Sequence, residues 1–112
     1  MIPPRRKFRN RPTEIDGHKF DSQAEGRRYE ELRLLELAGE ISDLRVHPKW
    51  DLVVNGALIC RYTADFCYLP KGPGDYVIED VKGGQATKTA VYKIKKKLML
   101  ALVGLDVVEV QA

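Results

Sequence analysis

Residues 76–82, YVIEDVK, begin as a buried strand and end in charge. Side chains alternate between the two faces of a strand, so Asp80 and Lys82 share one face while Glu79 lies on the other. An acid and an amine on an otherwise aromatic and aliphatic face cost desolvation free energy. A salt bridge, a solvated sheet edge, or a metal ion with an anionic substrate would compensate. The two glycines that follow leave room for a bulky ligand.

A second acid, Asp65, interrupts the preceding apolar run ALICRYTADFCYLP at residues 57–70. The turn residues at 70–75 predict antiparallel pairing of the two strands, which brings Asp65 beside Asp80. Two carboxylates and Lys82 then converge, and such a set binds a hard divalent cation such as Mg²⁺. The cation activates a water and neutralises phosphate charge, while the lysine steers that water.

The N-terminal part of the chain predicts a small hairpin and a helix. Asp16-Gly17 is a hairpin turn signal between short β-prone pieces. Helix formers then fill residues 22–38, with Ser22 or Asp21 as the capping residue. We therefore expect the first helix over this range.

The middle of the chain predicts an antiparallel meander over residues 50–82. A strand at 50–54 leads into Asn55-Gly56, the strongest short hairpin signal. The strand that follows is expected to run from 57 to 70, and the strand at 76–82 completes the meander.

A second helix is predicted from Thr87 or Thr89 to Gly104, followed by a short terminal strand, LDVVEV. We expect this strand to pair in parallel, because a helical crossover leads into it. The expected apolar, core-facing stripe of the helix is Val91, Ile94, Leu98 and Leu102. The predicted order is α-β-β-β-α-β, an α/β (α+β) fold with a mixed central sheet flanked by helices.

The composition is that of one small globular domain. The chain has 112 residues, 44% hydrophobic and 31% charged, with room for a single modest core. Its longest apolar run, 98–105, is too short for a membrane span of about twenty residues. Cys60 and Cys67, expected on opposite faces of one strand, cannot pair and fit buried thiols in a reducing compartment. We expect a cytoplasmic protein of a bacterial or phage-infected cell.

Basic residues gather in two places, and the net charge is +3. Residues 1–12 form a basic arm that precedes a single domain at 13–112. The side chains expected to bind DNA are Arg5, Arg6, Lys7, Arg9, Arg11, Lys88, Lys93, Lys96 and Lys97. A solvated arm and a solvated helix face are the alternative for both clusters.

Asp65 and the segment Glu79-Asp80-Val81-Lys82 resemble the PD-(D/E)xK nuclease signature, and the likeness extends from about residue 20 onward. The family places an acid on the second core strand and acid-x-lysine on the third, in a restriction-endonuclease-like αβββαβ core. A further acid often comes from its first helix, where Glu25 stands here. The resemblance implies metal-dependent cleavage of DNA.

On this resemblance the catalytic set is Glu25, Asp65, Asp80 and Lys82. The three acids would bind Mg²⁺, with Mn²⁺ substituting, and the lysine would support the attacking water. Ala64 stands where the family name has proline, and Gln85 and Tyr92 do not match the spacing of the glutamine-tyrosine pair in the exonuclease-like branches.

Three alternatives stay open from the residues. A bulge in the strand would put Glu79 in the place of Asp80. Glu25 with Ser22 also forms a capping-box pattern that needs no chemistry. His18 and His47 are isolated, a pattern more typical of structural or solvated histidines than of ligands.

The leading functional hypothesis is a small, Mg²⁺-dependent DNA endonuclease of phage type that acts as a homodimer and selects branched DNA, as Holliday-junction resolvases do. It needs no nucleotide cofactor and no membrane. The alternatives are a catalytically silent nucleic-acid-binding module and a nuclease subunit of a larger transposition or packaging complex.

Overall fold

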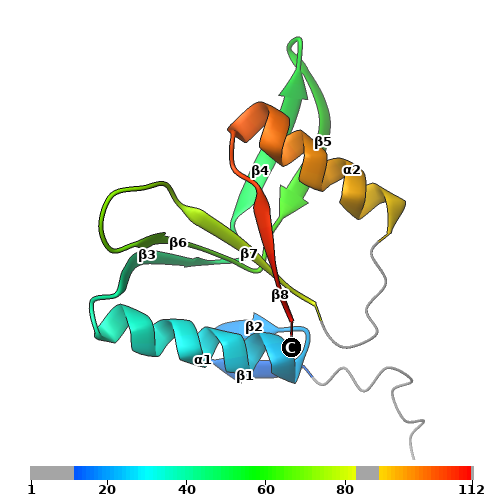
Figure 1. Cartoon of the computed structure of the whole chain (residues 1–112). Coiled ribbons are helices and arrows are strands. Elements are labelled where there is room, and N and C mark those ends of the chain that lie inside the picture. The colour runs from blue at the N-terminus through cyan, green and yellow to red at the C-terminus, as the bar shows by residue number, and fades with distance from the viewer. Residues whose placement is uncertain (1–11, 83–88, 112) are drawn as a thin grey trace, which may run out of the picture.

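The computed structural model describes residues 12–82 and 89–111, and these form a mixed α+β fold (Figure 1). In chain order the elements are β1 (Thr13–Ile15), β2 (His18–Phe20), α1 (Gln23–Leu37), β3 (Ile41–Val46), β4 (Lys49–Val54), β5 (Ala57–Thr63), β6 (Phe66–Pro70), β7 (Val77–Lys82), α2 (Ala90–Leu98), the π-helical turn η1 (Met99–Val103) and β8 (Val107–Gln111). No helix in the described ranges is long and apolar enough to cross a membrane.

The central sheet has four strands in the order β3-β6-β7-β8. Neighbouring strands pair antiparallel from β3 to β7, and β8 pairs in parallel with β7. A parallel neighbour requires a crossover, and α2 with η1 provides it. With α1 ahead of β3, the core order is α-β-β-β-α-β, which confirms the predicted fold class and the parallel last strand.

The predicted meander over 50–82 is wrong in its first strand. β4 pairs only with β5, in a hairpin separate from the central sheet. The turn Asn55-Gly56 closes this hairpin with both residues in the left-handed region, at φ 49° and 79°. The first core strand is instead β3, which the sequence indicates only as a short extended piece.

The predicted strand over 57–70 is broken in two. The backbone leaves the β4-β5 hairpin at Ala64, whose N–H donates to Pro48 O at 3.0 Å, and enters the central sheet at Phe66. Two different pairing partners require two strand directions, and the break allows both. Cys60 and Cys67 therefore lie in different sheets, and both are free thiols.

Helices α1 and α2 lie on opposite sides of the central sheet (Figure 1), and an apolar cluster lies on each side. The cluster on the α1 side consists of Phe20, Tyr29, Leu32, Ile41, Phe66 and Tyr68. The cluster on the α2 side consists of Leu52, Tyr62, Ala64, Cys67, Ile78, Met99 and Val107. The β1-β2 hairpin, turning at Asp16-Gly17 as predicted, contributes to the first, and the β4-β5 hairpin contributes to the second.

The predicted core-facing stripe of α2 is confirmed at Leu98, which packs against the core, and is wrong at its other three positions. Val91 and Ile94 are 61% and 58% exposed, and Leu102 is exposed too. The helix turns a different face to the sheet, with Tyr92 half-buried and Met99 fully buried. Amphipathic spacing gives the period of a helix but not its rotation, and here a tyrosine and a methionine fill the space over β7 and β8.

The helix rotation can be tested by two truncations in the α2 segment. Met99→Ala should lower the free energy of unfolding by about 2–5 kcal/mol, because it leaves a cavity in a closed core. Ile94→Ala should change it by less than about 0.5 kcal/mol, because the side chain is mostly in water. Urea unfolding followed by the fluorescence of Trp50, which packs against this core, measures both. Equal losses would contradict this orientation of α2.

Candidate metal-binding cleft

An open cleft of about 470 Å³ lies at the C-terminal end of β7, beside the first turn of α2. Its charged lining residues are Glu25, Arg61, Asp65, Asp80, Lys82 and Lys95. The four residues predicted as the catalytic set therefore line one cleft. They arrive from three places: Glu25 from α1, Asp65 from the β5-β6 junction, and the other two from β7.

Asp65 and Asp80 are locked together by backbone hydrogen bonds. The Asp65 N–H donates to Asp80 Oδ1 at 3.2 Å, and the Val81 N–H donates to Asp65 Oδ2 at 2.6 Å. Phe66 pairs with Glu79 where β6 meets β7, so the residue before Phe66 falls beside the residue after Glu79. The two carboxylates are thus held next to each other by the strand register itself.

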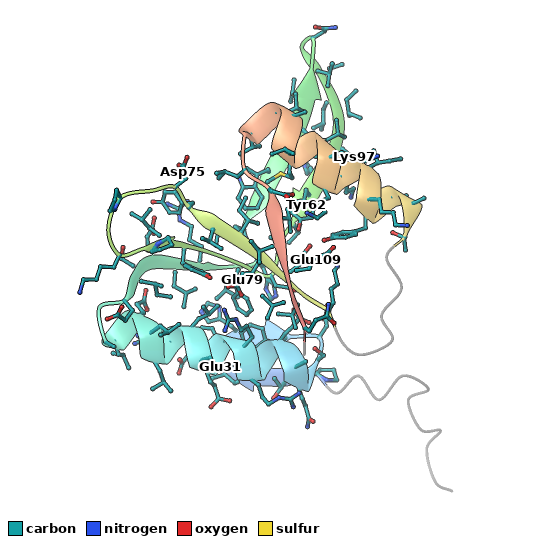
Figure 2. The ribbon with its side chains drawn as sticks, viewed as in Figure 1. Glu31, Tyr62, Asp75, Glu79, Lys97 and Glu109 are labelled. Atoms are coloured by element: carbon teal, nitrogen blue, oxygen red, sulfur yellow. The ribbon has the colours of Figure 1, made fainter. Side chains whose placement is uncertain are left out.

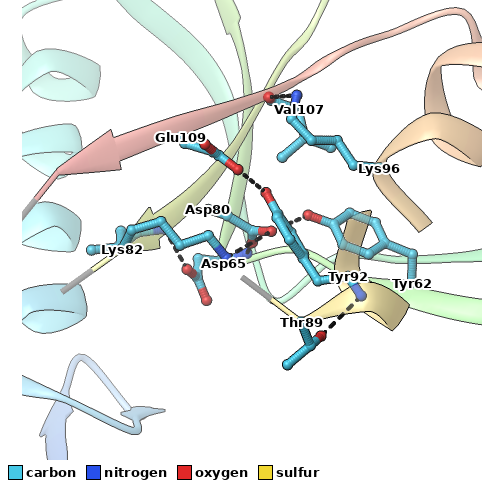
Figure 3. A network of polar contacts seen from close by, with 10 residues as sticks. Tyr62, Asp65, Asp80, Lys82, Thr89, Tyr92, Lys96, Val107 and Glu109 are labelled. Atoms are coloured by element: carbon cyan, nitrogen blue, oxygen red, sulfur yellow. Dashed lines mark hydrogen bonds and ion pairs between the residues drawn. The ribbon is translucent and has the colours of Figure 1, made fainter. Parts of the chain in front are cut away.

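Asp80 is the acid that shares the cleft with Lys82. The Tyr62 hydroxyl donates a hydrogen bond to Asp80 Oδ2, and Lys82 Nζ lies 4.0 Å from the same oxygen (Figure 3). Burial raises the pKa of Asp80, the Tyr62 hydrogen bond lowers it and the charge of Asp65 raises it. Lys82 Nζ also lies 3.6 Å from the centroid of the Tyr92 ring, a cation–π contact that holds the amine in place.

Glu79 lies on the opposite face of β7, between the sheet and α1 (Figure 2). Arg28 Nε and Nη2 donate to its two carboxylate oxygens at 2.9 and 2.8 Å, and the Tyr68 hydroxyl donates as well. β7 pairs with β8 without a register shift, so no bulge exchanges Glu79 with Asp80. The structure therefore settles this alternative in favour of Asp80, and Glu79 anchors α1 to the sheet.

Glu25 serves the helix cap with its backbone and the cleft with its side chain. The backbone N–H of Glu25 donates to Oγ of Ser22, the N-cap residue of α1, at 3.2 Å. Its carboxylate approaches Asp65 and His47, with Glu25 Oε1 3.8 Å from His47 Nε2. One ligand atom from each of these three residues lies within 4.8 Å of the other two. The capping and metal-binding alternatives are therefore compatible.

The electrostatics of Asp65 fit a cation. Burial and, to a smaller extent, hydrogen bonding to Glu25 raise the pKa of Asp65 to about 7, against the opposing effect of the Val81 N–H. A buried carboxyl that holds its proton beside a second acid can exchange that proton for a metal ion. The donor set of carboxylates and one imidazole suits a divalent cation.

His47, Tyr62 and Tyr92 are the parts of the site that the sequence did not reveal. The prediction that His47 is isolated is wrong, because its imidazole faces two acids of the cleft. Tyr62 is buried in the core, and its hydroxyl donates a hydrogen bond to Asp80. A histidine before a proline at a strand end gives no signal of such a contact, since the partners lie far away in sequence.

Most of the predicted DNA-binding residues lie outside the described residues, namely Arg5, Arg6, Lys7, Arg9, Arg11 and Lys88. On α2, Lys93 and Lys97 are exposed. Lys96 Nζ donates to Asp106 Oδ1 at 2.6 Å and to Val107 O at 2.7 Å, so it ties the helix to β8. Lys95 instead lines the cleft.

A family model described as "Protein of unknown function (DUF1064)" matches residues 5–104. The match spans most of the chain, which therefore belongs to this family. No curated protein and no solved structure matches the chain.

The different surroundings of the two adjacent acids on β7 predict losses of stability of different size. Glu79→Gln should lower the free energy of unfolding by about 3 kcal/mol, because it leaves Arg28 without its anionic partner in a buried setting. Asp80→Asn should cost about 1 kcal/mol or less, because the amide keeps the shape and removes a buried charge. Chemical denaturation measures both, and a larger loss for Asp80→Asn would refute this assignment.

The raised pKa of Asp65 predicts how stability depends on pH without metal. A carboxyl with a higher pKa in the folded than in the unfolded chain binds more protons when folded, so its contribution falls as pH rises from about 4 to about 7. Asp65→Asn should therefore raise the melting temperature in chelator more at pH 8 than at pH 5.

Calorimetry at the two pH values measures this difference, with Asp75→Asn as a matched control at an exposed acid outside the cleft. A gain from Asp65→Asn that is the same at both pH values would contradict the prediction.

Proposed function

We propose that this member of the DUF1064 family is a metal-dependent endodeoxyribonuclease with a site like that of the PD-(D/E)xK nucleases. The observation that carries the proposal is the meeting of Glu25, Asp65, Asp80 and Lys82 in one cleft. Acid-x-lysine alone occurs by chance in many strands. Its convergence with two further acids, inside an α-β-β-β-α-β core, supports a catalytic reading over a surface ion pair.

The acids would hold the metal. Asp65, with Glu25 and Asp80 beside it, offers carboxylate oxygens for Mg²⁺ or Mn²⁺. A cation bound here would supply Lewis acidity, lowering the pKa of a water and neutralising charge on a phosphate. The Val81 N–H fixes the orientation of the Asp65 carboxylate toward the cleft.

Lys82 would act on the water or on the scissile phosphate. Its amine is held between the Asp80 carboxylate and the Tyr92 ring, and Tyr92 is itself fixed by a 2.8 Å hydrogen bond to Glu109. A lysine restrained in this way loses little further entropy when it donates to an oxygen in the cleft. The Asp80 carboxylate is the negatively charged partner of the Lys82 amine.

The cations around the cleft would bind the DNA backbone. Lys95 and Arg61 line the cleft, and Lys93 and Lys97 extend the positive charge along the exposed side of α2. Such contacts give affinity that falls steeply with salt and carry little base readout. The basic arm would add further phosphate contacts. Lys96 already donates hydrogen bonds to Asp106 and Val107, so we do not expect it to bind DNA.

The biological setting follows from the same reading. Cutting both strands of a duplex or junction with one cleft per chain is most simply done by a homodimer, so we propose this assembly. Branched DNA, including the four-way junction, is the proposed substrate, in the cytoplasm of a bacterial or phage-infected cell. A silent DNA-binding module is disfavoured because carboxylates in the cleft would repel phosphate in the absence of metal.

The test is cleavage by the purified chain of labelled four-way junction, matched linear duplex and single strand. Reactions contain Mg²⁺, Mn²⁺ or chelator, and products are resolved on denaturing gels. We expect metal-dependent cuts that Asp80→Asn and Lys82→Ala each reduce by at least about 100-fold, through loss of charge stabilisation and water positioning. Asp75→Asn should leave the rate unchanged.

Other outcomes are equally informative. Cleavage that persists in Asp80→Asn would mark a contaminating nuclease. DNA binding without cutting by the unaltered chain under both metals would reject autonomous activity and leave the subunit and binding-module alternatives. Equal rates on the junction and the linear duplex would reject the structure selectivity.

A further inference from the structure

We propose that His47 is a metal ligand together with Glu25 and Asp65, and that its nitrogen makes the centre prefer Mn²⁺ to Mg²⁺. The inference rests on the proposed function only in placing a cation in the cleft. It goes further in naming a ligand from outside the acid-x-lysine set and in assigning the class of metal.

The distances bring the three groups to one point. Glu25 Oε1 lies 3.8 Å from His47 Nε2, and ligand atoms of Glu25, His47 and Asp65 all lie within 4.8 Å of one another. A first-row cation sits about 2.0–2.2 Å from each ligand atom, so ligands around it are up to about 4.4 Å apart. Only a small inward movement would bring all three onto one ion.

Asp80 stands beside this group rather than in it. Asp80 Oδ1 accepts from the Asp65 N–H at 3.2 Å, and Oδ2 accepts from the Tyr62 hydroxyl. Oδ2 also faces Lys82 at 4.0 Å, so Asp80 borders the group of converging ligand atoms without belonging to it. Among the described residues, the group whose ligand atoms converge contains a nitrogen and two carboxylates.

The fold holds the imidazole in its place. The backbone N–H of His47 donates to the backbone carbonyl of Asp65 at 3.0 Å, so a backbone hydrogen bond connects the two proposed ligands. The His47 ring lies against Phe20, with 5.7 Å between ring centroids. His47 also adopts a left-handed conformation, at φ 53°, which a residue with a bulky side chain adopts at a cost. These constraints hold the side chain beside the carboxylates of Glu25 and Asp65.

The ligand chemistry then selects the metal. Mg²⁺ binds oxygen ligands and keeps much of its water, and it gains little from an imidazole. First-row transition ions accept nitrogen ligands, whereas carboxylate oxygens suit both Mg²⁺ and Mn²⁺, so adding one imidazole to two carboxylates favours Mn²⁺ over Mg²⁺. The remaining open side of the cleft leaves room for water and a phosphate oxygen. The predicted Mg²⁺ cofactor is therefore replaced by Mn²⁺ in this proposal.

The first experiment measures metal affinity without DNA. Mn²⁺ binding is titrated by the loss of the free-ion EPR signal, and Mg²⁺ affinity is obtained by competition. His47→Asn is the test variant, because Asn tolerates the left-handed backbone. His18→Asn is the matched control, since the chain has two histidines and His18 lies on β2 outside the cleft.

We expect His47→Asn to weaken Mn²⁺ binding by about 10- to 100-fold, as losses around metal centres typically do. Mg²⁺ affinity should fall by less than about threefold, since oxygen ligands dominate its binding. His18→Asn should match the unaltered protein. Equal Mn²⁺ affinity in both variants would overturn the proposal, as would loss of both metals by the same factor in a folded His47→Asn.

A second measurement needs no folded His47→Asn. In the His18→Asn protein, the pulsed EPR of bound Mn²⁺ should show coupling to a ¹⁴N nucleus that changes to ¹⁵N after labelling of histidine. The absence of nitrogen coupling, or a ¹⁴N coupling that stays unchanged after histidine labelling, would overturn the assignment of His47 as a ligand.

The outcomes also separate this inference from the proposed function. Bound Mn²⁺ with histidine coupling but no cleavage of any DNA would support the metal centre and reject the nuclease. Metal-dependent cleavage with no histidine coupling would reject His47 as a ligand and leave the nuclease intact. Absence of any metal binding would overturn this inference.

Discussion

The pairing of Phe66 with Glu79 is the constraint on which the site depends. It sets the register of β6 on β7, and through it the Asp65 N–H reaches Asp80 while the Val81 N–H reaches the Asp65 carboxylate. Shifting the register by one residue would turn every side chain of β7 to the other face. The acids of the cleft are thus positioned by backbone hydrogen bonds, which are stiffer supports than side-chain packing.

The two faces of β7 place its adjacent acids in different surroundings. On the α1 face, Glu79 is fully paired by Arg28 and Tyr68 and is almost completely buried. On the α2 face, Asp80 is also buried, but with Lys82 it lines an open cleft. Adjacent acids of the same strand therefore meet opposite environments, one closed by an arginine and one available to a ligand.

Without a bound cation, the acids of the cleft lower the stability of the fold. Asp65 and Glu25 crowd two carboxylates into a partly buried space, and burial raises the pKa of Asp65 to about 7. A protein that only needed to fold would gain by neutralising such a pair, as functional sites commonly trade stability for activity. A bound cation would remove this repulsion, so metal binding and stability are linked. His47, which lies beside both acids, would bind the same cation.

Sequence alone determined much of this molecule because its strongest signals are local. Strand alternation put Asp80 and Lys82 on one face, Asn55-Gly56 and Asp16-Gly17 marked true turns, and the Ser22 cap located the start of α1. These depend on φ/ψ preferences and short-range hydrogen bonds, which neighbouring residues decide. The mixed α+β class follows from the order of these elements.

Tertiary structure decided the features that depend on distant partners. Long-range pairing decided which strands share a sheet, so β3 belongs to the central sheet and β4 and β5 form a separate hairpin. The rotation of α2 was settled by what fills the space above β7, which placed Met99 inside and Ile94 outside. His47 reached Glu25 and Asp65 only because β3 ends where β6 begins, a contact between residues far apart in the chain that no local pattern encodes.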